Sequence, residues 1–427
     1  MNSHLGIKSF RPKQLKNAIL TTYLMLLTQA LSLLGFACYP SALTIIQAEW
    51  NLSNFESGFL ASSFFLGYVL VVPIATTLTD RIDTRQVYLA GGLAAGLGLL
   101  GVGFFANGFY SALLFLMIHG AGVSAMYMPG LKIISDRVTS GEITRHISFY
   151  TAFFGLGTGA SYYFSGVLIR EFSWSLAFIL IAIGPICAGI LAWLGTKALP
   201  GEKGIFDIQM KLGDAFPVAR WKKVLAMKEA VGYMLGYSAH TLELFATRAW
   251  LVAFFTYCAS IAAPEQPFLI SATLIVAFLN IISIPASILG NEMALKVGRH
   301  RWVYWVMIGS AISGITLGMS VDSHWTVIVA LAFIHSMFVM ADSATLTAGL
   351  VISVPQEIKG TAMGLHSLMG FGAGLVGPAL FGATLDISRY LGYSGWTAAY
   401  ASIVVWGLLF IFYTQFSLWK NKRVTQL

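Results

Sequence analysis

The sequence predicts an all-α integral membrane protein in which twelve transmembrane helices form two pseudo-symmetric bundles of six. Three observations support this fold class. Of the 427 residues, 57% are hydrophobic and only 10% are charged, the apolar segments are continuous, and the two halves of the chain repeat one pattern. Soluble globular proteins carry about 25% charged residues. The composition therefore excludes a soluble enzyme, a secreted domain, a nucleic-acid-binding protein and a disordered chain.

The apolar segments are long enough to cross a bilayer as helices, because about 20 residues span its hydrocarbon core. They lack the alternating pattern of membrane β-barrel strands. The first segment is too long for the core of a signal peptide, so we expect it to remain as a helix. The expected spans are residues 18–46, 54–79, 86–106, 109–134, 146–170, 172–195, 229–262, 267–293, 302–321, 324–351, 360–388 and 396–419.

The basic residues predict the orientation of these spans. With both termini in the cytoplasm, 22 of the 26 lysines and arginines fall in cytoplasmic segments, whereas the outer loops hold only Arg170 and Arg389. Cytoplasmic loops of membrane proteins are enriched in basic residues. This asymmetry predicts an even number of spans with both termini inside. It also accounts for the net charge of +8 without a nucleic-acid or other acidic partner.

A polar connector with seven basic residues divides the chain into two corresponding halves. His119 corresponds to His335 at an offset of 216 residues, and a glycine row beginning at Gly155 recurs from Gly370 at an offset of 215. Parallel repeats of this kind are typical of secondary transporters, and one chain that carries both repeats can form the pathway as a monomer. We expect a basic cytoplasmic tail at 1–17, bundles at 18–195 and 229–419, a cytoplasmic loop at 196–228 and a cytoplasmic tail at 420–427.

The loop after the second span carries a recognisable motif. Its sequence, Leu78-Thr79-Asp80-Arg81-Ile82-Asp83-Thr84-Arg85, resembles the motif G-x-L-x-D-R-x-G-R-[RK] of the major facilitator superfamily. The matching residues are Leu78, Asp80, Arg81 and Arg85, while Thr76 and Asp83 replace the two glycines. In the second half Gly298 and Arg299 match, and Leu295 replaces the acidic residue.

This resemblance extends over about residues 19–419 and implies a secondary transporter that rocks its two bundles around a central cavity. It also implies that Asp80 and Arg81 hold the outward-open state, with Arg85, Gly298 and Arg299 completing the gating loops. The alternative is that Asp80 and Arg81 are solvated loop charges that only set the topology, because surface ion pairs contribute only ~0–1 kcal/mol.

Ionisable residues within the spans are candidates for substrate binding or proton coupling, because each costs roughly 2.5–3.5 kcal/mol to insert. The seventh span contains His240, Glu243 and Arg248. His240 and Glu243 are three residues apart and share a helix face, which suits a proton-accepting site. The alternative is a buried Glu243–Arg248 or Glu243–His240 pair that only fixes helix packing.

Two histidines and an aspartate extend this candidate set. His119 and His335 occupy equivalent positions in the fourth and tenth spans, and Asp342 lies two turns beyond His335 on the same helix face. They are candidates for binding a substrate or a proton, or else they are packing residues. Lys132 precedes Asp136 by four residues, which a snorkelling side chain and a helical ion pair explain.

Glycine rows in the fifth and eleventh spans predict close helix crossings and bending where the halves meet. Their members are Gly155, Gly157 and Gly159 in the fifth span and Gly370, Gly372, Gly374 and Gly377, followed by Pro378, in the eleventh.

The chain contains neither a G-x-x-x-x-G-K-[ST] phosphate loop nor an H-E-x-x-H metal motif, so we expect no ATP use, no enzymatic activity, no cofactor and no metal. The cationic set of Arg248, the two histidines and, as a further candidate, Lys132 faces only Glu243 and Asp342, which favours proton-coupled uptake of a small organic anion. The alternatives are a drug or metabolite antiporter that exchanges protons, and a receptor or assembly protein without transport. The expected location is the bacterial cytoplasmic (inner) membrane, with the lipid bilayer, a small-molecule substrate and protons as partners.

Overall fold

The computed structural model describes residues 12–138, 143–199, 212–262 and 268–415. Within these ranges the secondary structure is helical, without strands. Most of the predicted tails at 1–17 and 420–427, and residues 200–211 of the predicted connector, lie outside the described residues. The all-α prediction is confirmed.

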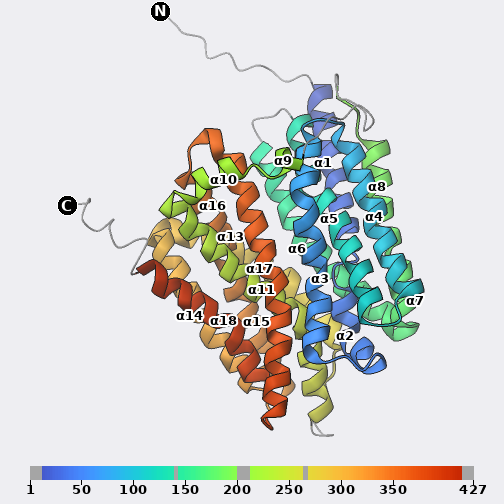
Figure 1. Ribbon diagram of the computed structural model, residues 1–427, viewed down its shortest axis with the longest axis vertical. Helices are drawn as coiled ribbons and strands as arrows, with labels where there is room; N and C mark the ends of the chain where they lie inside the picture. Colours follow the sequence, from blue (N-terminus) through green and yellow to red (C-terminus); the bar gives the residue numbers. More distant parts are fainter. Residues whose placement is uncertain (1–11, 139–142, 200–211, 263–267, 416–427) are drawn as a thin grey trace, which may run out of the picture.

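Two groups of helices lie side by side and are joined by short helices (Figure 1). The first group comprises α1 (Pro12–Ser32), α2 (Cys38–Glu49), α3 (Asn54–Thr79), α4 (Thr84–Phe105), α5 (Phe109–Arg137), α6 (Ile143–Glu171), α7 (Trp174–Ile181) and α8 (Ile183–Gly195). The connecting helices are α9 (Leu212–Ala215) and α10 (Val218–Leu225). The second group comprises α11 (Lys228–Ile261), α12 (Ala272–Ile282), α13 (Ile284–Val297), α14 (Arg299–Met319), α15 (Trp325–Ala341), α16 (Ser343–Ser353), the 3₁₀ turn η2 (Gln356–Ile358), α17 (Lys359–Tyr390) and α18 (Trp396–Tyr413).

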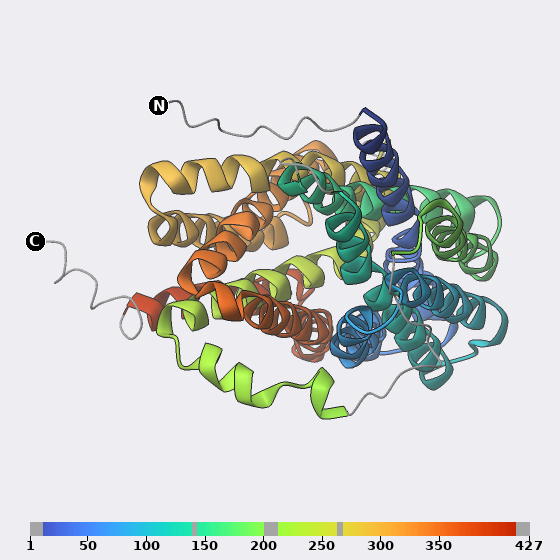
Figure 2. The same cartoon turned by 90° about the horizontal axis from the view of Figure 1, so that it is seen from above.

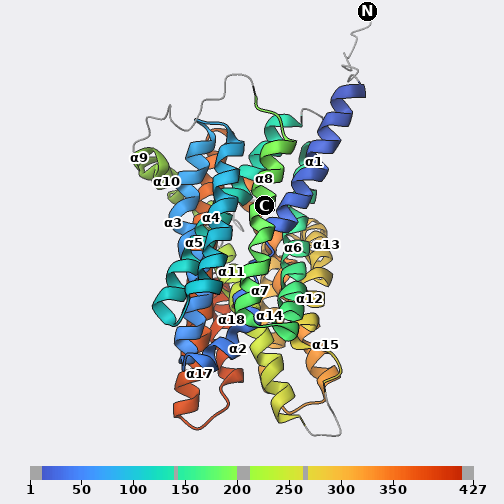
Figure 3. The ribbon, with the colours of Figure 1, turned by 90° about the vertical axis from the view of Figure 1, so that its right-hand side faces the viewer.

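The number of membrane-crossing segments agrees with the prediction of twelve. Eleven segments in the described part of the chain are long and apolar enough to cross a membrane. The twelfth is the pair α1 and α2, in which the apolar stretch Ile19–Ser32 is continued by α2 after a short break. These two helices follow one another along the height of the molecule (Figure 3).

Four spans that the apolar pattern predicts as continuous helices are interrupted, at residues 33–37, Ala182, Ser283 and Asp342. Pro185 and Pro285 lie in the first turn after two of these breaks. Proline has no backbone N–H and clashes with the carbonyl four residues earlier, so it starts a helix more readily than it continues one. No proline explains the break at Asp342.

At the Asp342 break a neighbouring helix satisfies a backbone group. The indole Nε1 of Trp302 in α14 donates a hydrogen bond of 3.0 Å to the carbonyl oxygen of Ala341. At the break between α1 and α2, Gly35 lies directly against the His119 ring, and a Cβ at Gly35 would lie 2.6 Å from His119 Cε1. At both breaks the interrupted backbone is therefore covered by a neighbouring helix and not exposed to lipid.

The two halves share a hydrophobic core at one end of the molecule only. We call the end that carries α9 and α10 the connector end, and the end with the loops at 50–53, 106–108, 320–324 and 391–395 the distal end. At the distal end one core includes side chains of α2, α3, α11, α12 and α17 from both halves. Towards the connector end each half has its own core. In the described residues, Phe245 and Phe371 of the second half join the core of the first, and Leu244 and Leu375 pack against it. The halves are therefore held together mainly distally.

The helix pairs α3–α17 and α6–α12 form most of the contact between the halves (Figure 2). The connector contacts both halves, because α9 packs on α3 of the first half and α10 packs on α17 of the second. Glycines allow α3 and α17 to approach closely. A Cβ at Gly58 would lie 2.2 Å from the Pro378 carbonyl oxygen, and one at Gly382 would lie 2.1 Å from the Asn54 carbonyl oxygen. A side chain at either position would separate the two helices.

A carboxylate of the second half caps a helix of the first half at the distal end. Asp386 Oδ1 in α17 accepts hydrogen bonds from the backbone N–H and the side-chain amide of Asn54, at 3.0 and 2.7 Å. Its Oδ2 accepts from the backbone N–H of Phe55 at 2.8 Å. The first N–H groups of a helix lack partners in their own helix and favour a negative charge. Asp386 therefore stabilises the state in which the distal ends meet.

Replacing Asp386 with alanine should shift the molecule towards states with separated distal ends. Loss of a helix-capping carboxylate costs about 1–2 kcal/mol, which corresponds to a change of ~5–30-fold in the ratio of the two states. Double electron–electron resonance between spin labels at Asn107 and Tyr393 would measure this ratio. Thr384→Ala is the control, because Thr384 bonds only to Leu380 O of its own helix. An unchanged distance distribution in Asp386→Ala would refute the capping role.

Candidate functional site

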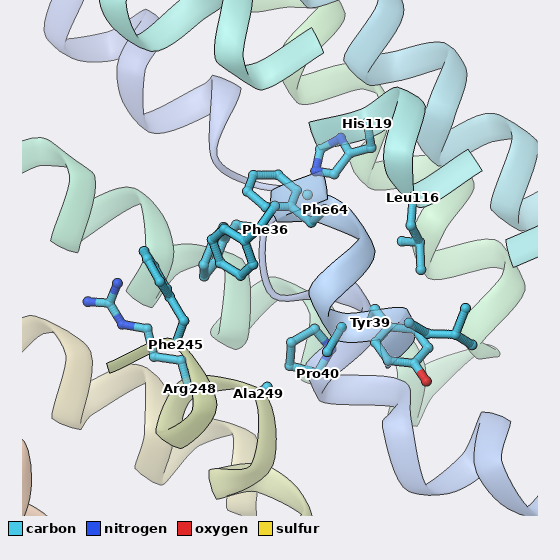
Figure 4. Close-up of a pocket in the computed structure, with 13 residues that line it drawn as sticks. Phe36, Tyr39, Pro40, Phe64, Leu116, His119, Phe245, Arg248 and Ala249 are labelled. Carbon is cyan, nitrogen blue, oxygen red and sulfur yellow. The ribbon is translucent and has the colours of Figure 1, made fainter. Parts of the chain in front are cut away.

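A narrow cavity between the halves borders the shared core, and the space between its lining atoms is about 420 Å³ with open solvent included. Its walls come from the α1–α2 break, α2, α3, α5 and α11. They are formed by Gly35, Phe36, Tyr39, Pro40, Leu60, Ala61, Phe64, Phe65, Leu116, His119, Phe245, Arg248 and Ala249 (Figure 4). Of these thirteen residues only Tyr39, His119 and Arg248 carry polar side chains. The cavity is thus an aromatic and aliphatic space with two basic groups on its walls.

Arg248 in α11 is buried, with 7% of its surface exposed. Its side chain makes no hydrogen bond or ion pair within the described part of the chain, and its Cζ lies 5.9 Å from the centre of the Phe154 ring. It also lines a second cavity, of about 330 Å³, with Asn280 and Ser283 of the second half. A buried guanidinium without a counter-charge is costly, so this arrangement is suited to receiving an anion.

His240 and Asp342 form a buried contact across the second half. His240 Nδ1 in α11 lies 2.8 Å from Asp342 Oδ1, and their side chains are 2% and 4% exposed. Asp342 stands at the break between α15 and α16, with φ −103° and ψ −14°. Contrary to the sequence-based grouping, His240 pairs with Asp342 rather than with Glu243. The two atoms are close, but the contact lacks hydrogen-bond geometry, and Asp342 Oδ1 has no hydrogen-bond partner within the described residues.

Glu243 lies one turn further along α11 and contacts two other helices. Ser310 of α14 donates a hydrogen bond to Glu243 Oε1, and His335 Nε2 of α15 lies 3.9 Å from the same oxygen. The other ring nitrogen of His335 lies 3.3 Å from Ser313 Oγ. A second carboxylate–histidine pair therefore lies near the first, and neither forms an ion pair with Arg248.

Tyr237 and His366, which were not among the residues predicted from the sequence, extend this cluster. The Tyr237 ring stacks on His366 at 3.9 Å between ring centres and lies 5.7 Å from the His240 ring. Thr347 Oγ1 lies 3.3 Å from His366 Nε2. The criterion that selected the other histidines, an ionisable residue inside a span, also applies to His366. Nothing in the sequence distinguishes Tyr237 from an aromatic packing residue.

His119 is separated from this cluster and belongs to the first half. Its Nδ1 lies 3.1 Å from the Ala95 carbonyl oxygen, which makes Nδ1 the hydrogen donor, while its buried Nε2 has no hydrogen-bond partner within the described residues. In Figure 4 the ring lies on the opposite side of Phe36 and Phe64 from the Arg248 guanidinium. The structure does not bring His119 and His335 together despite their equivalent positions.

The predicted gating loop contacts the connector and its own half. Arg81 forms a 2.9 Å ion pair with Asp214 of α9. Asp80 lies 3.5 Å from Lys132 of α5, whose Nζ also lies 3.2 Å from Asp136. The loop therefore holds the connector against the first half through Arg81.

In the corresponding loop of the second half, Gly298 joins α13 to α14 with a φ of 92°, a conformation that favours glycine. Arg299 Nη1 donates a hydrogen bond of 3.1 Å to Asn291 Oδ1.

Asp83, which replaces a glycine of the motif, begins α4 and holds Arg85. Its Oδ1 accepts a 2.9 Å hydrogen bond from the Arg85 N–H, and its Oδ2 accepts one of 2.9 Å from Arg85 Nε. Arg85 also donates to the Thr196 carbonyl oxygen and lies over the Trp193 ring. Burial acts to raise the pKa of Asp83, but the hydrogen bonds and charge of Arg85 outweigh it and hold that pKa below its usual 3.8.

The glycine rows lie mostly at helix contacts. A Cβ at Gly155 or Gly159 would meet Ile284 or Ile281 of the second half, and one at Gly157 would meet Leu33. Three glycines of α17 face α11: a Cβ would meet Tyr237 at Gly370, Phe245 at Gly374 and the Leu242 carbonyl oxygen at Gly377. A Cβ at Gly372 would have no atom within 4 Å. Pro378 accepts a hydrogen bond of 2.9 Å from Trp250 Nε1 through its carbonyl oxygen. In the described ranges, no cluster of three or more His, Cys, Asp or Glu residues is arranged to hold a metal.

The family model of the Major Facilitator Superfamily matches residues 25–378. The chain belongs to this superfamily. It is a multi-pass integral membrane protein, with eleven apolar helices in the described part of the chain that are long enough to cross a membrane. This agrees with the resemblance seen in the loop motif.

Several relatives of this superfamily member are known, all at low identity. It is 28% identical over 171 residues to a probable sphingolipid transporter, spinster homolog 1 of Arabidopsis thaliana, and spans about a third (34%) of that relative's length. It is 23% identical to a putative niacin/nicotinamide transporter of Bacillus subtilis, with 82% of this chain and 84% of the relative covered. It is 22% identical to the hexuronate transporter of the same species, with 86% and 89% covered.

Among solved structures, a bacterial homolog of the human lysosomal transporter Spinster, in an inward-facing and unoccupied conformation, shares the fold with a TM-score of 0.73. The match covers 95% of this chain and 96% of the other at 15% identity.

Asp83→Asn should destabilise the fold by about 1 kcal/mol, the usual effect of losing a helix-capping group, because it loses the charge-assisted contact with Arg85. The Asp83 carboxylate has a lowered pKa in the folded state, so its contribution is present above about pH 4 and is lost as the pH falls further. Thermal unfolding of the detergent-solubilised protein at pH 7 and pH 3 would measure both effects. A melting-temperature difference of the same size at both pH values would contradict this role.

Proposed function

We propose that this transporter moves a small organic anion together with protons across the bacterial cytoplasmic membrane by alternating access. The observation that carries the proposal is the buried Arg248 guanidinium, which lacks a counter-charge in the protein, beside a cavity between the halves. The carboxylate–histidine pairs one to two turns away along α11 supply candidate proton sites.

Arg248 is the residue we assign to the substrate's negative charge. A desolvated arginine without a carboxylate is unfavourable, and a bound carboxylate or phosphate offers two oxygens that match the guanidinium fork. Two relatives support a carboxylate in part. Niacin and hexuronates, named for the Bacillus subtilis proteins, are carboxylic acids, whereas nicotinamide, also named for the first of them, is an uncharged amide.

Glu243 with His335, and Asp342 with His240, are the sites we assign to coupling protons. These groups come from α11, α15 and the α15–α16 break, and His366 of α17 and Ser310 of α14 face them. Proton uptake at a buried carboxylate reduces the negative charge inside the second half. Anion uptake at Arg248 reduces the positive charge. When the proton and the anion are both bound, the site carries little net charge. This favours the conformational change that moves the bound anion across the membrane interior.

The two-core arrangement supports alternating access. The halves share one core distally and have separate cores towards the connector end, so separation at the connector end leaves the shared core intact. With the termini in the cytoplasm, as the basic residues favour, this conformation faces inward. Asp80, Arg81 and the second-half loop at Gly298 and Arg299 then lie on the cytoplasmic side.

Arg248→Gln should lower the affinity for a transported carboxylate roughly 10-fold to 100-fold, because a hydrogen-bonded charge contributes about 1.5–3 kcal/mol. Uptake of radiolabelled carboxylates by proteoliposomes would measure the change. Arg301→Gln is the control, since Arg301 is exposed on α14. Carboxylate uptake unaffected by Arg248→Gln would remove Arg248 from the substrate site.

Glu243→Gln should abolish the dependence of uptake on a proton gradient, because glutamine cannot release or accept the proton. Substrate uptake by proteoliposomes would be measured with an imposed pH gradient, and substrate exchange would be measured without a gradient. The comparison separates loss of proton coupling from loss of substrate binding. Glu292→Gln is the matched control, as Glu292 is exposed on α13. Persistence of proton-driven uptake in Glu243→Gln would exclude this coupling site. Substrate movement against the direction of proton entry would instead indicate the antiporter, and absence of any flux would indicate the receptor.

A further inference from the structure

The space next to Arg248 is built from aromatic rings of both halves. Phe36 of the α1–α2 break lies 6.0 Å from Phe154 and 6.3 Å from Phe245, measured between ring centres. Phe154 also lies beside the Arg248 guanidinium. The Phe36–Phe154 pair is T-shaped and the Phe36–Phe245 pair is tilted. The buried cation thus stands at the edge of a ring cluster in which Phe36 meets Phe154 and Phe245 at an angle, while Phe245 stacks on Phe371 on its other side.

This lining offers few partners for a ligand with several hydroxyl groups. The polar side chains of the main cavity are Tyr39, His119 and Arg248, and His119 lies on the far side of Phe36 and Phe64 from the guanidinium. A polyhydroxylated ligand would leave unpaired groups against the phenylalanines, each of which costs free energy. A flat ring would instead keep the angled ring contacts that the cluster already makes.

We propose that the substrate class is a small aromatic carboxylate. Its carboxylate pairs with Arg248, and its ring inserts among Phe36, Phe154 and Phe245. This inference rests on the proposed anion transport and adds the chemistry of the rest of the ligand. In this proposal the three phenylalanine rings select the substrate by its flat ring. If they served only to pack the helices, they would not distinguish flat from saturated rings.

Entry of the ligand requires one of these rings to move, because only a small part of the cavity is wide enough for a water molecule. Phe36 is suited to this movement. It belongs to the non-helical residues 33–37, and its ring contacts Phe245 of the other half. Separation of the halves therefore withdraws a neighbour from Phe36 and opens the position that the ligand ring takes.

The test compares three probes on the purified full chain: benzoate, cyclohexanecarboxylate and benzamide. Benzoate and cyclohexanecarboxylate share the charge and the six-carbon ring, and benzamide keeps the flat ring without the charge. Isothermal titration calorimetry should show benzoate binding about fivefold or more tightly than cyclohexanecarboxylate, from ring–ring contacts. Benzamide should bind at least 10-fold more weakly than benzoate.

Variants separate ring recognition from folding. Phe36→Leu and Phe154→Leu should each weaken benzoate binding more than cyclohexanecarboxylate binding, and so reduce the preference for benzoate. Phe278→Leu, at a residue 57% exposed on the outer face of α12, is the control. The preference in the unmodified protein tests the proposal even if a variant fails to fold.

The outcomes distinguish this inference from the function it rests on. Equal affinity for the two acids overturns the aromatic class and leaves anion transport standing. Benzamide binding as tightly as benzoate, or binding of neither acid, overturns both. A preference for benzoate that survives Phe36→Leu and Phe154→Leu places the aromatic ligand elsewhere and overturns the proposed site.

Discussion

A positive charge held inside an apolar bundle is the constraint on which the rest of the arrangement depends. Arg248 is almost completely buried, the part of the chain described here offers it no carboxylate, and an aromatic ring lies beside it. The two carboxylates nearby on α11 and at the end of α15 are engaged with histidines and a serine. Negative groups are thus present in the same half but are paired elsewhere, which leaves the guanidinium available to a ligand.

The helix interruptions are linked to this electrostatic arrangement. Asp342 lies between α15 and α16, at the point where its side chain contacts His240. The indole N–H of Trp302 donates a hydrogen bond to the adjacent Ala341 carbonyl oxygen. In the first half, residues 33–37 bring Phe36 to the centre of the ring cluster and Gly35 against His119. A regular helix would use its backbone groups for hydrogen bonds within itself. The breaks therefore let one span of each half contribute both backbone and side chain to the centre of the molecule.

The sequence predicted the spans, the two halves and the family because these depend on averages over many residues: long apolar runs, the placement of lysine and arginine, and a repeat of about 215 residues. It did not predict the breaks. Pro185 and Pro285 stand in otherwise continuous apolar runs, where proline is tolerated in membrane helices, and no local signal marks Asp342.

The site was predictable only in part. Glu243, Arg248, His240 and Asp342 stand out as ionisable residues in apolar segments. Their partners do not, because Ser310, Phe154 and Tyr237 are ordinary residues for such helices and come from elsewhere in the chain. The pairing of Arg81 with Asp214 was hidden for the same reason: it depends on the path of the connector. The alternative of a Glu243–Arg248 or Glu243–His240 packing pair followed from spacing along one helix, whereas the contacts of Glu243 come from α14 and α15.

Asp386 accepts hydrogen bonds from the first backbone N–H groups of α3 in the other half of the molecule, next to the N-cap residue Ser53. If the distal ends separate, as the proposed alternating access requires, the backbone amides of Asn54 and Phe55 lose this carboxylate and bond to water instead. Exchange of these two amide protons with deuterated solvent is therefore expected to follow the opening of the distal end. Its rate would report that opening without a label or a known substrate.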